Sequence, residues 1–412
     1  MHILWLKTEL LHPVDKGGRI RTYQMLRALR HEHRITYLTL DDGTAAPDAA
    51  LLASEYCHEL VRIPFAAPAK GTPAFWLDLL RNGVSSLPYA VAKYRSAAMR
   101  RAIIERVAVG DVDVVVCDFL FPSINVAEGL GTPTVLFQHN VESMIWERHA
   151  AVAAHPVKRR YMRQQWRRMQ RWEQAECLRF DHVVTVSEED AAIIRDRFAA
   201  RSVSSVPTGV DVEFFRPTGA VPRAPRELVF TGSMDWMPNE DAIRYLVTEV
   251  MPRLRQRFPD VTLTVVGRNP PAAVQALAAD QGVTITGRVP DVRPYMERGA
   301  VFIVPIRVGG GTRLKIYEAM AMECPVVSTR VGAEGLPLDA GRHLLLADTP
   351  EELAAAIGGL LDDPARARAL AVAAAEHVRT HFAWERAAAD FTEACVTASV
   401  RRSGTVPAGA VA

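Results

Sequence analysis

The chain has 412 residues, of which 49% are hydrophobic and 23% are charged, and this balance is typical of a packed globular protein rather than a disordered one. At about 100–200 residues per domain, the length predicts two or three domains. There are 49 Lys and Arg residues against 47 Asp and Glu, so the net charge of +2 gives no sign of a nucleic-acid-binding protein.

The cysteines and the apolar runs indicate the cellular compartment in which the protein is expected. The five cysteines are widely spaced and odd in number, which excludes a C-x-x-C site and argues against a disulfide framework. The apolar run at 2–8 is interrupted by Lys7 and follows no basic region, so it predicts a strand and not a signal peptide. No run of 18 apolar residues occurs, so no membrane-spanning helix is expected. We predict a cytoplasmic protein with reduced thiols.

Through the first half of the chain, short apolar runs alternate with longer helical segments such as 20–30. The runs lie at 2–8, 34–40, 112–119, 133–138 and 182–187. Continuous apolar runs are typical of strands covered on both faces, so this half predicts a parallel sheet with crossover helices.

The same pattern begins again in the second half. Strands are predicted at 227–232, 261–267, 283–286, 300–305, 324–329 and 343–347, and helices at 240–257, 313–322, 350–361, 364–379 and 384–400. The intervening segment 204–226 contains six Pro and Gly residues that interrupt regular structure. Two successive β/α series predict two doubly wound α/β domains.

The clearest chemical signal lies in the segment 305–324. Three glycines follow a predicted strand, and a helix is expected to open near Thr312. Glycines let a ligand approach the backbone closely, and the start of a helix offers unpaired N–H groups. Arg313 and Lys315 place cations in a first turn that would otherwise favour acids, which makes sense if an anion such as a pyrophosphate binds there.

Glu318 lies about one and a half turns further along the same predicted helix. A carboxylate at this position could accept hydrogen bonds from vicinal hydroxyls, as on a ribose. The alternative interpretation is a glycine-rich turn that opens an ordinary helix, with Arg313 and Lys315 in solvent.

The stretch GGGTRLKIYEAMAMECPVVSTRVGAEGL, which begins at Gly309, resembles the donor-site region of the family 4 glycosyltransferases, retaining enzymes of the GT-B fold. Eight further blocks occur in the order found in that family. They are Lys16-Gly17-Gly18-Arg19, Gln138-His139-Asn140, TVSEED at 185–190, VPTGVDVEFFRP at 206–217, VFTGSM at 229–234, VVGR at 265–268, TGRVPDV at 286–292 and HFAWERAA at 381–388. The resemblance covers nearly the whole chain.

The resemblance implies a GT-B architecture, in which two Rossmann-like doubly wound domains face a central cleft. Residues 1–206 would bind the acceptor and residues 207–383 the nucleotide-sugar. The helix 384–400 would cross back to the first domain, and 401–412 would form a flexible tail.

The resemblance also implies roles for individual residues. Glu318 matches the second glutamate of the E-x7-E motif, which binds the donor ribose, and His139 matches a histidine near the reacting sugar. With Arg313 and Lys315, these two residues form the expected catalytic set. The expected donor-binding residues are Gly17, Gly18, Arg19, Gly232, Ser233, Gly287, Arg288, Val289, Gly309, Gly310, Gly311 and Thr312.

The sequence departs from the family pattern at two places. Gly310 stands where the first glutamate of E-x7-E is expected, and 232–241 lacks the Arg and Lys that usually follow the first strand of the second domain. We hypothesise that Arg313 and Lys315 take over charge neutralisation, and that backbone N–H groups of 310–312 bind the sugar hydroxyls. The chain would then belong to a subset with a GGGTRLK-type loop.

The chemistry expected of such a protein needs no metal and no other cofactor, since the nucleoside-diphosphate sugar is a substrate. The D-x-D triplet at 111–113 precedes a predicted strand and is interpreted as a loop. With no obvious nucleophile, retention predicts same-face attack on the sugar, in which His139 orients or polarises. The alternatives are a sugar-nucleotide epimerase, a phosphorylase, or a non-catalytic nucleotide-sugar-binding protein.

The segment 158–172 has seven cations and no acid. At helical spacing, one face carries Arg159, Arg163 and Arg167, while another carries Met162, Trp166 and Met169. One interpretation is a peripheral contact with an anionic membrane at its inner face, or with a lipid-linked acceptor. The other is a helix that packs on its own sheet and leaves its arginines in solvent.

Overall fold

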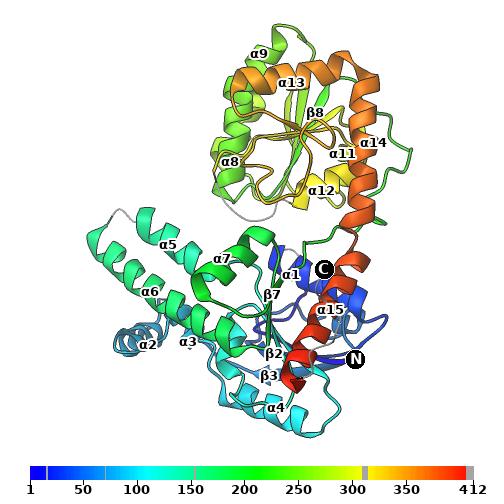
Figure 1. Cartoon of the computed structure of the whole chain (residues 1–412). Helices are drawn as coiled ribbons and strands as arrows, with labels where there is room; N and C mark the ends of the chain where they lie inside the picture. Colours follow the sequence, from blue (N-terminus) through cyan, green and yellow to red (C-terminus); the bar gives the residue numbers. More distant parts are fainter. Residues whose placement is uncertain (15–16, 70, 153–154, 309–313, 405–412) are drawn as a thin grey trace. The chain divides into compact units, whose positions relative to one another are not determined.

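The computed structural model describes residues 1–14, 17–69, 71–152, 155–308 and 314–404 (Figure 1). The chain divides into two compact units. Unit 1 comprises Met1–Pro207 and Trp384–Ala412, and unit 2 comprises Thr208–Ala383.

Unit 1 is built on a sheet of seven parallel strands in the order β3-β2-β1-β4-β5-β6-β7. The strands are β1 (His2–Lys7), β2 (Arg34–Asp41), β3 (Glu59–Pro64), β4 (Val114–Asp118), β5 (Thr134–Phe137), β6 (His182–Thr185) and β7 (Val203–Ser205). Every residue of β1, β4, β5 and β6 is buried, which explains their continuous apolar runs. The sequence did not predict β3 and β7, because these two edge strands are only partly buried and carry polar residues.

Helices cover this sheet and connect its strands. They are α1 (Gly17–Leu29), η1 (Leu52–Glu55), α2 (Pro73–Gly83), α3 (Tyr89–Ala92), α4 (Ala97–Ala108), η2 (Phe121–Asn125), α5 (Glu142–Val152), α6 (Pro156–Arg179), α7 (Glu188–Phe198) and α15 (Trp384–Ser403). The C-terminal helix α15 packs on α1, β5 and β6, where the ring of Phe391 lies 5.3 Å from Trp5 and 5.0 Å from Phe137.

The end of α15 corrects the expected start of the tail at 401. The helix continues to Ser403, because Arg401 donates a hydrogen bond to the carbonyl of Arg201 and Arg402 pairs with Asp181 at 3.2 Å. Residues 405–412 lie outside the described residues.

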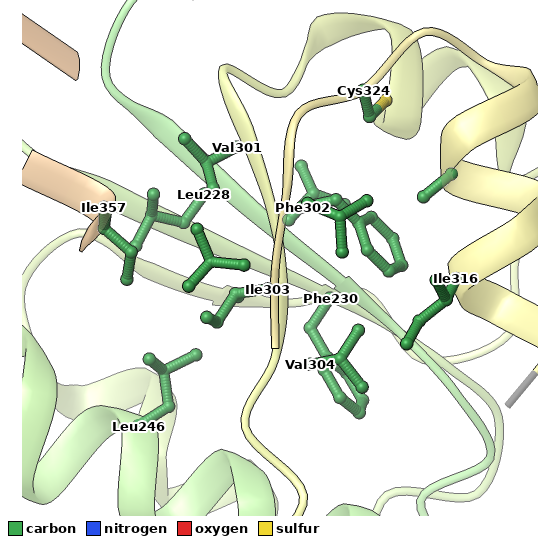
Figure 2. Close-up of a cluster of buried hydrophobic side chains, with 14 of the residues drawn as sticks. Leu228, Phe230, Leu246, Val301, Phe302, Ile303, Val304, Ile316, Cys324 and Ile357 are labelled. Atoms are coloured by element: carbon green, nitrogen blue, oxygen red, sulfur yellow. The ribbon is translucent and has the colours of Figure 1, made fainter. Parts of the chain in front are cut away.

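Unit 2 has six parallel strands in the order β10-β9-β8-β11-β12-β13. They are β8 (Glu227–Thr231), β9 (Thr262–Val266), β10 (Val283–Ile285), β11 (Val301–Val304), β12 (Val326–Ser328) and β13 (Leu345–Leu346), and each lies within a predicted strand. Successive side chains of β11 point to opposite faces, so that Ile303 lies toward Leu246 and Phe302 toward Ile316 (Figure 2). This sheet therefore has an apolar core on both of its faces.

The helices of unit 2 depart from the prediction in two ways, since the short helices between residues 272 and 298 were not predicted and one predicted helix is divided. They are α8 (Met237–Tyr245), η3 (Leu246–Val250), α9 (Met251–Arg255), α10 (Ala272–Gln275), η4 (Ala276–Ala279), α11 (Arg293–Arg298), α12 (Leu314–Ala321), α13 (Pro350–Asp362) and α14 (Pro364–His381). The single helix predicted over 240–257 is divided by a π-helical turn at η3, which ends two residues before Pro252. Proline has no N–H to continue the α-helical hydrogen-bond ladder, so the ladder is interrupted there.

Both sheets follow the Rossmann strand order, which confirms the prediction of two doubly wound α/β domains. In each sheet the direction of winding reverses beside the first strand, between β1 and β4 in unit 1 and between β8 and β11 in unit 2. Ligands of such sheets bind beyond the carboxyl ends of the strands at this reversal. A ligand-binding site is therefore expected at these two edges.

Candidate functional site

Three neighbouring strands of unit 2 are followed by glycines. Gly232 follows β8, Gly267 follows β9, and Gly287 lies two residues beyond β10. The N–H of Gly267 donates to the carbonyl of Gly287 at 3.2 Å. A Cβ atom on Gly267 would lie 1.7 Å from the carbonyl oxygen of Gly232, so no larger residue fits there. We call these three residues the glycine shelf, an edge of backbone without side chains.

Lys315 on α12 lies beside the first glycine of the shelf. Its Nζ donates to Oδ1 of Asn239 at 2.9 Å and lies 4.1 Å from the centre of the Phe230 ring. A Cβ atom on Gly232 would approach this Nζ to 2.6 Å. The absence of a side chain at Gly232 therefore makes room for the ammonium group, and the structure brings these two predicted residues together.

A second cation of this edge was not singled out in the sequence. Arg268 directly follows the shelf residue Gly267, and its Nε donates to the hydroxyl of Ser233 at 2.9 Å. The carbonyl of Ser233 in turn accepts a hydrogen bond from Nδ2 of Asn239 at 2.7 Å. Ser233, a predicted donor-binding residue, thus joins Arg268 to Asn239. A cation directly after a strand-ending glycine was the signal that could have identified Arg268.

Glu318 lies on α12, one turn beyond Lys315, and is partly buried. Burial raises the pKa of its carboxyl to about 7, although Lys315 acts to lower it. A carboxyl group with such a pKa exchanges its proton near neutral pH, so it can both donate and accept hydrogen bonds.

The other predicted donor residues of unit 2 divide into two groups. Arg288 is exposed and Val289 is partly buried, and both directly follow the shelf residue Gly287. Gly309, Gly310, Gly311, Thr312 and Arg313 lie outside the described residues.

At the corresponding edge of unit 1, the carboxylate of Asp118 at the end of β4 is fully buried. Its Oδ2 accepts hydrogen bonds from Lys7 Nζ at 2.8 Å, Thr22 Oγ1 at 2.6 Å and Trp5 Nε1 at 3.0 Å. Burial acts to raise the pKa of Asp118, but Lys7 and His139 hold it well below its usual range. The sequence analysis did not single out Asp118 or Lys7, although each is a charged residue that ends a buried strand.

His139, a predicted catalytic residue, follows β5 and lies against this carboxylate. Its Nε2 is 2.8 Å from Oδ1 of Asp118, within ion-pair distance but without the alignment of a hydrogen bond. Its ring stacks on Phe119, with 3.9 Å between the ring centres. Burial lowers the pKa of His139 to about 3, against the opposing effect of Asp118, so the imidazole is neutral near pH 7.

Phe119 has an unusual backbone conformation for a bulky residue, with a φ angle of +72°. Such a conformation costs about 1–3 kcal/mol and often occurs at functional sites. Its ring is 4.3 Å from Nζ of Lys7, and a Cβ atom on Gly18 would lie 2.9 Å from the same ring. Packing against Phe119 is therefore sufficient to require a glycine at 18.

The other two predicted residues of the first glycine segment have different surroundings. Gly17 begins α1 and has open space around its Cα, while Arg19 pairs with Glu9, with 2.9 Å from Nε to Oε2. The two aspartates of the D-x-D triplet at 111–113 interact with other residues of unit 1. Asp113 accepts a hydrogen bond from the backbone N–H of His2, and Oδ2 of Asp111 lies 3.7 Å from Nη1 of Arg34.

Unit 1 also contains a pair of buried carboxyl groups, those of Glu142 and Glu173, at the start of α5. Glu173 on α6 accepts the backbone N–H groups of Glu142 at 2.7 Å and Ser143 at 2.9 Å, and so caps the start of α5. Burial raises the pKa of Glu142 to about 8 and that of Glu173 to about 7. The proximity of the two carboxyls adds to the shift at Glu142.

Family models match both units. A model described as Glycosyltransferase Family 4 matches residues 16–214, and one described as Glycosyl transferases group 1 matches residues 225–363. The chain belongs to the family 4 glycosyltransferases.

Among curated relatives, this family 4 member is 28% identical over 226 residues to a GDP-mannose-dependent alpha-(1-6)-phosphatidylinositol monomannoside mannosyltransferase of Mycolicibacterium smegmatis. The match covers 48% of the chain and 59% of the relative. The chain spans about half the length of the curated relatives it matches.

Solved structures extend the likeness to the whole chain. Sucrose-phosphate synthase from Thermosynechococcus elongatus has a TM-score of 0.69 at 20% identity, covering 95% of this chain and 97% of that one. HepE from Anabaena in complex with UDP has a TM-score of 0.67 at 14% identity, covering 96% and 100%. Together with the two Rossmann-like sheets, this likeness confirms the predicted GT-B fold.

Proposed function

We propose that this family 4 member transfers a sugar from a nucleoside-diphosphate sugar to an acceptor hydroxyl, with retention of configuration and without a metal. The observation that carries the proposal is the glycine shelf of unit 2, with Lys315 beside Gly232 and Arg268 beside Gly267. A shelf of backbone next to cations suits a diphosphate, which needs close approach and charge neutralisation.

The donor binds through unit 2 in this proposal. Lys315 and Arg313 neutralise the diphosphate, and Glu318, one turn beyond Lys315 on α12, accepts hydrogen bonds from the ribose hydroxyls. The complex of HepE with UDP supports a nucleotide donor, since that protein shares the fold of this chain.

The transfer step follows from the chemistry of the donor. The bond between the sugar C1 and the β-phosphate oxygen breaks, and the acceptor oxygen forms its bond to C1 on the same face. The acceptor proton passes to the departing phosphate oxygen. Negative charge grows on that phosphate, and a fixed cation such as Lys315 lowers the barrier. His139 orients or polarises rather than acting as the base, because its low pKa makes it a weak proton acceptor.

The acceptor belongs to the class of glycans, lipid-linked molecules or small molecules that offer a hydroxyl. The name of the mycobacterial relative, which refers to a phosphatidylinositol monomannoside, favours a lipid-linked acceptor. A peripheral contact with an anionic membrane is part of this proposal.

A screen of nucleotide-sugars by thermal shift tests the donor. A ligand at 100 times its Kd should add about 2.7 kcal/mol of stability. Transfer to an acceptor is then followed by NMR of the new anomeric centre, with and without a chelator. An inverted product, or activity that the chelator abolishes, would contradict the proposed mechanism. An epimerised donor as the product would indicate an epimerase instead, and a sugar phosphate would indicate a phosphorylase.

A further inference from the structure

Helix α2 exposes a row of large apolar side chains. The exposed fractions are 56% for Trp76, 49% for Leu77, 73% for Leu80 and 95% for Val84, the residue that follows the helix. Positions 76, 80 and 84 are four residues apart, so they lie on one face of the helix, and Leu77 adjoins them. An apolar row of this size at a protein surface indicates a contact with another molecule or with a membrane.

A groove rich in arginine adjoins this apolar row. Its volume is about 920 Å³, and Val84 and Pro156 form part of its wall. The cations that line it all come from α6 and are Arg159, Arg160, Arg163, Arg167, Arg168 and Arg171. Val84 thus belongs both to the apolar row and to the groove.

Hydrogen bonds join α2 to α6 and make the two features one surface (Figure 1). The guanidinium of Arg168 is buried and donates to the carbonyls of Asn82 at 2.8 Å and Gly83 at 2.7 Å. Met169 is buried and Trp166 is partly buried, so these two residues of α6 pack within unit 1. The tryptophan most available for a membrane contact is therefore Trp76 of α2 rather than Trp166 of α6.

Several cations of the groove have no carboxylate to balance them. Among the described residues, no Asp or Glu lies within ion-pair distance of Arg160, Arg163, Arg167 or Arg171. Arg163 and Arg167, and Arg167 and Arg171, are four residues apart, a spacing at which like charges on a helix repel. An external anion would relieve this repulsion.

We infer that the surface formed by α2 and α6 docks on an anionic lipid bilayer. Trp76, Leu77, Leu80 and Val84 enter the interface between headgroups and acyl chains, and the arginines of α6 lie over the lipid phosphates. A soluble anion would satisfy the groove but would leave the apolar row of α2 in water, so the two features together favour a bilayer. This docking deepens the membrane contact included in the proposed function, and because it needs neither donor nor acceptor, it is tested separately from the transfer reaction.

Flotation of the full chain with vesicles, in the absence of any substrate, tests this inference. Vesicles of phosphatidylcholine and phosphatidylglycerol should bind the chain at low salt, and vesicles of phosphatidylcholine alone should not. R163Q/R167Q should bind roughly 30-fold more weakly, because each cation near an anionic surface contributes about 1 kcal/mol. W76S/L80S should bind at least about tenfold more weakly, because it removes apolar surface from the interface.

Matched variants of unit 1 serve as controls. R100Q/R101Q removes two exposed arginines of α4, and L51S/V109S removes two exposed apolar side chains, and both should float like the unchanged chain. Retained circular dichroism and thermal midpoints would show that all four variants are folded. Flotation of W76S/L80S equal to that of L51S/V109S would overturn the inference and leave the groove as a site for soluble anions. Equal binding to neutral vesicles, or no binding to anionic ones, would also overturn it.

Discussion

The two sheets have the same strand order, but the residues at the carboxyl ends of their strands differ. In unit 1 the edge is closed, since Lys7, Asp118 and His139 are buried there and the ring of Phe119 packs on them. In unit 2 the edge is partly exposed, and it consists of glycines that follow three successive strands, with Lys315 beside the first of them. The fold offers a ligand edge in both units, and the residues that follow each strand decide what that edge can bind.

The difference also separates two kinds of charged group. Lys7 in unit 1 forms an ion pair with the buried carboxylate of Asp118, so its charge is neutralised inside the protein. Lys315 in unit 2 instead donates a hydrogen bond to the neutral side-chain amide oxygen of Asn239, beside the glycine shelf. Four substitutions test this contrast.

Asp118→Asn should have the largest effect on stability, because it leaves Lys7 buried without a counter-charge at the closed edge. Breaking such a pair from one side typically costs about 3–5 kcal/mol of unfolding free energy. Urea unfolding measures the loss. The double variant Lys7→Met/Asp118→Asn is the matched control and should recover part of the stability. A double variant less stable than Asp118→Asn alone would argue against a coupled pair.

Lys315→Met should slow turnover by about 10²–10³-fold, since a preorganised donor aimed at the leaving group contributes about 2.7–4 kcal/mol to catalysis. The methionine keeps the packing of the side chain against Phe230, so the thermal midpoint should change little. Arg368→Ala on α14 removes an exposed cation of the same unit and should leave turnover unchanged. A rate for Lys315→Met close to that of Arg368→Ala would remove Lys315 from the proposed site.

Gly267→Ala should destabilise unit 2 by about 1–3 kcal/mol, because the new methyl group would overlap the carbonyl of Gly232. It should also weaken nucleotide-sugar binding, which thermal shift with and without ligand would detect. Gly359→Ala in α13 is the control, since its Cβ atom would have its nearest neighbour at 3.8 Å, an ordinary contact. If Gly267→Ala proved as stable as Gly359→Ala, the glycine shelf would not be as close-packed as the structure indicates.

Glu142→Gln should have the smallest effect, and this effect should grow as the pH rises from about 4.3 to about 8. The pKa of Glu142 is about 8 in the folded chain and about 4.3 when unfolded, so between these values the folded state binds the extra proton. Stability conferred by this proton is present below about pH 4.3 and is lost as the pH rises through 8. The variant should match the unchanged chain at pH 5 and exceed it by about 1–3 kcal/mol at pH 8.5 in urea unfolding. The exposed Glu128→Gln is the control, and a constant difference across pH would contradict the assignment.

Much of the fold could be predicted because its strands are buried on both faces. The run VVVCD forms β4 and ELVFT forms β8, and in both strands the interior residues are apolar and every residue is buried. The strands β3 and β7 escaped prediction because they are only partly buried and polar residues interrupt their apolar pattern. The position of Lys315 in the glycine-to-helix segment was visible in the sequence, but its contact with Asn239 was not, since 76 residues separate the two.

The sequence by itself determined the two doubled β/α series, the nine ordered blocks of a glycosyltransferase family and the residues at which strands give way to glycines. Only the tertiary structure decided which of these residues meet. Parallel strands that are distant in the chain become neighbours through crossover helices, and this brings Lys7 to Asp118 across 111 residues. The same crossovers align Gly232, Gly267 and Gly287 at one edge, and spacing along the chain alone does not reveal that alignment.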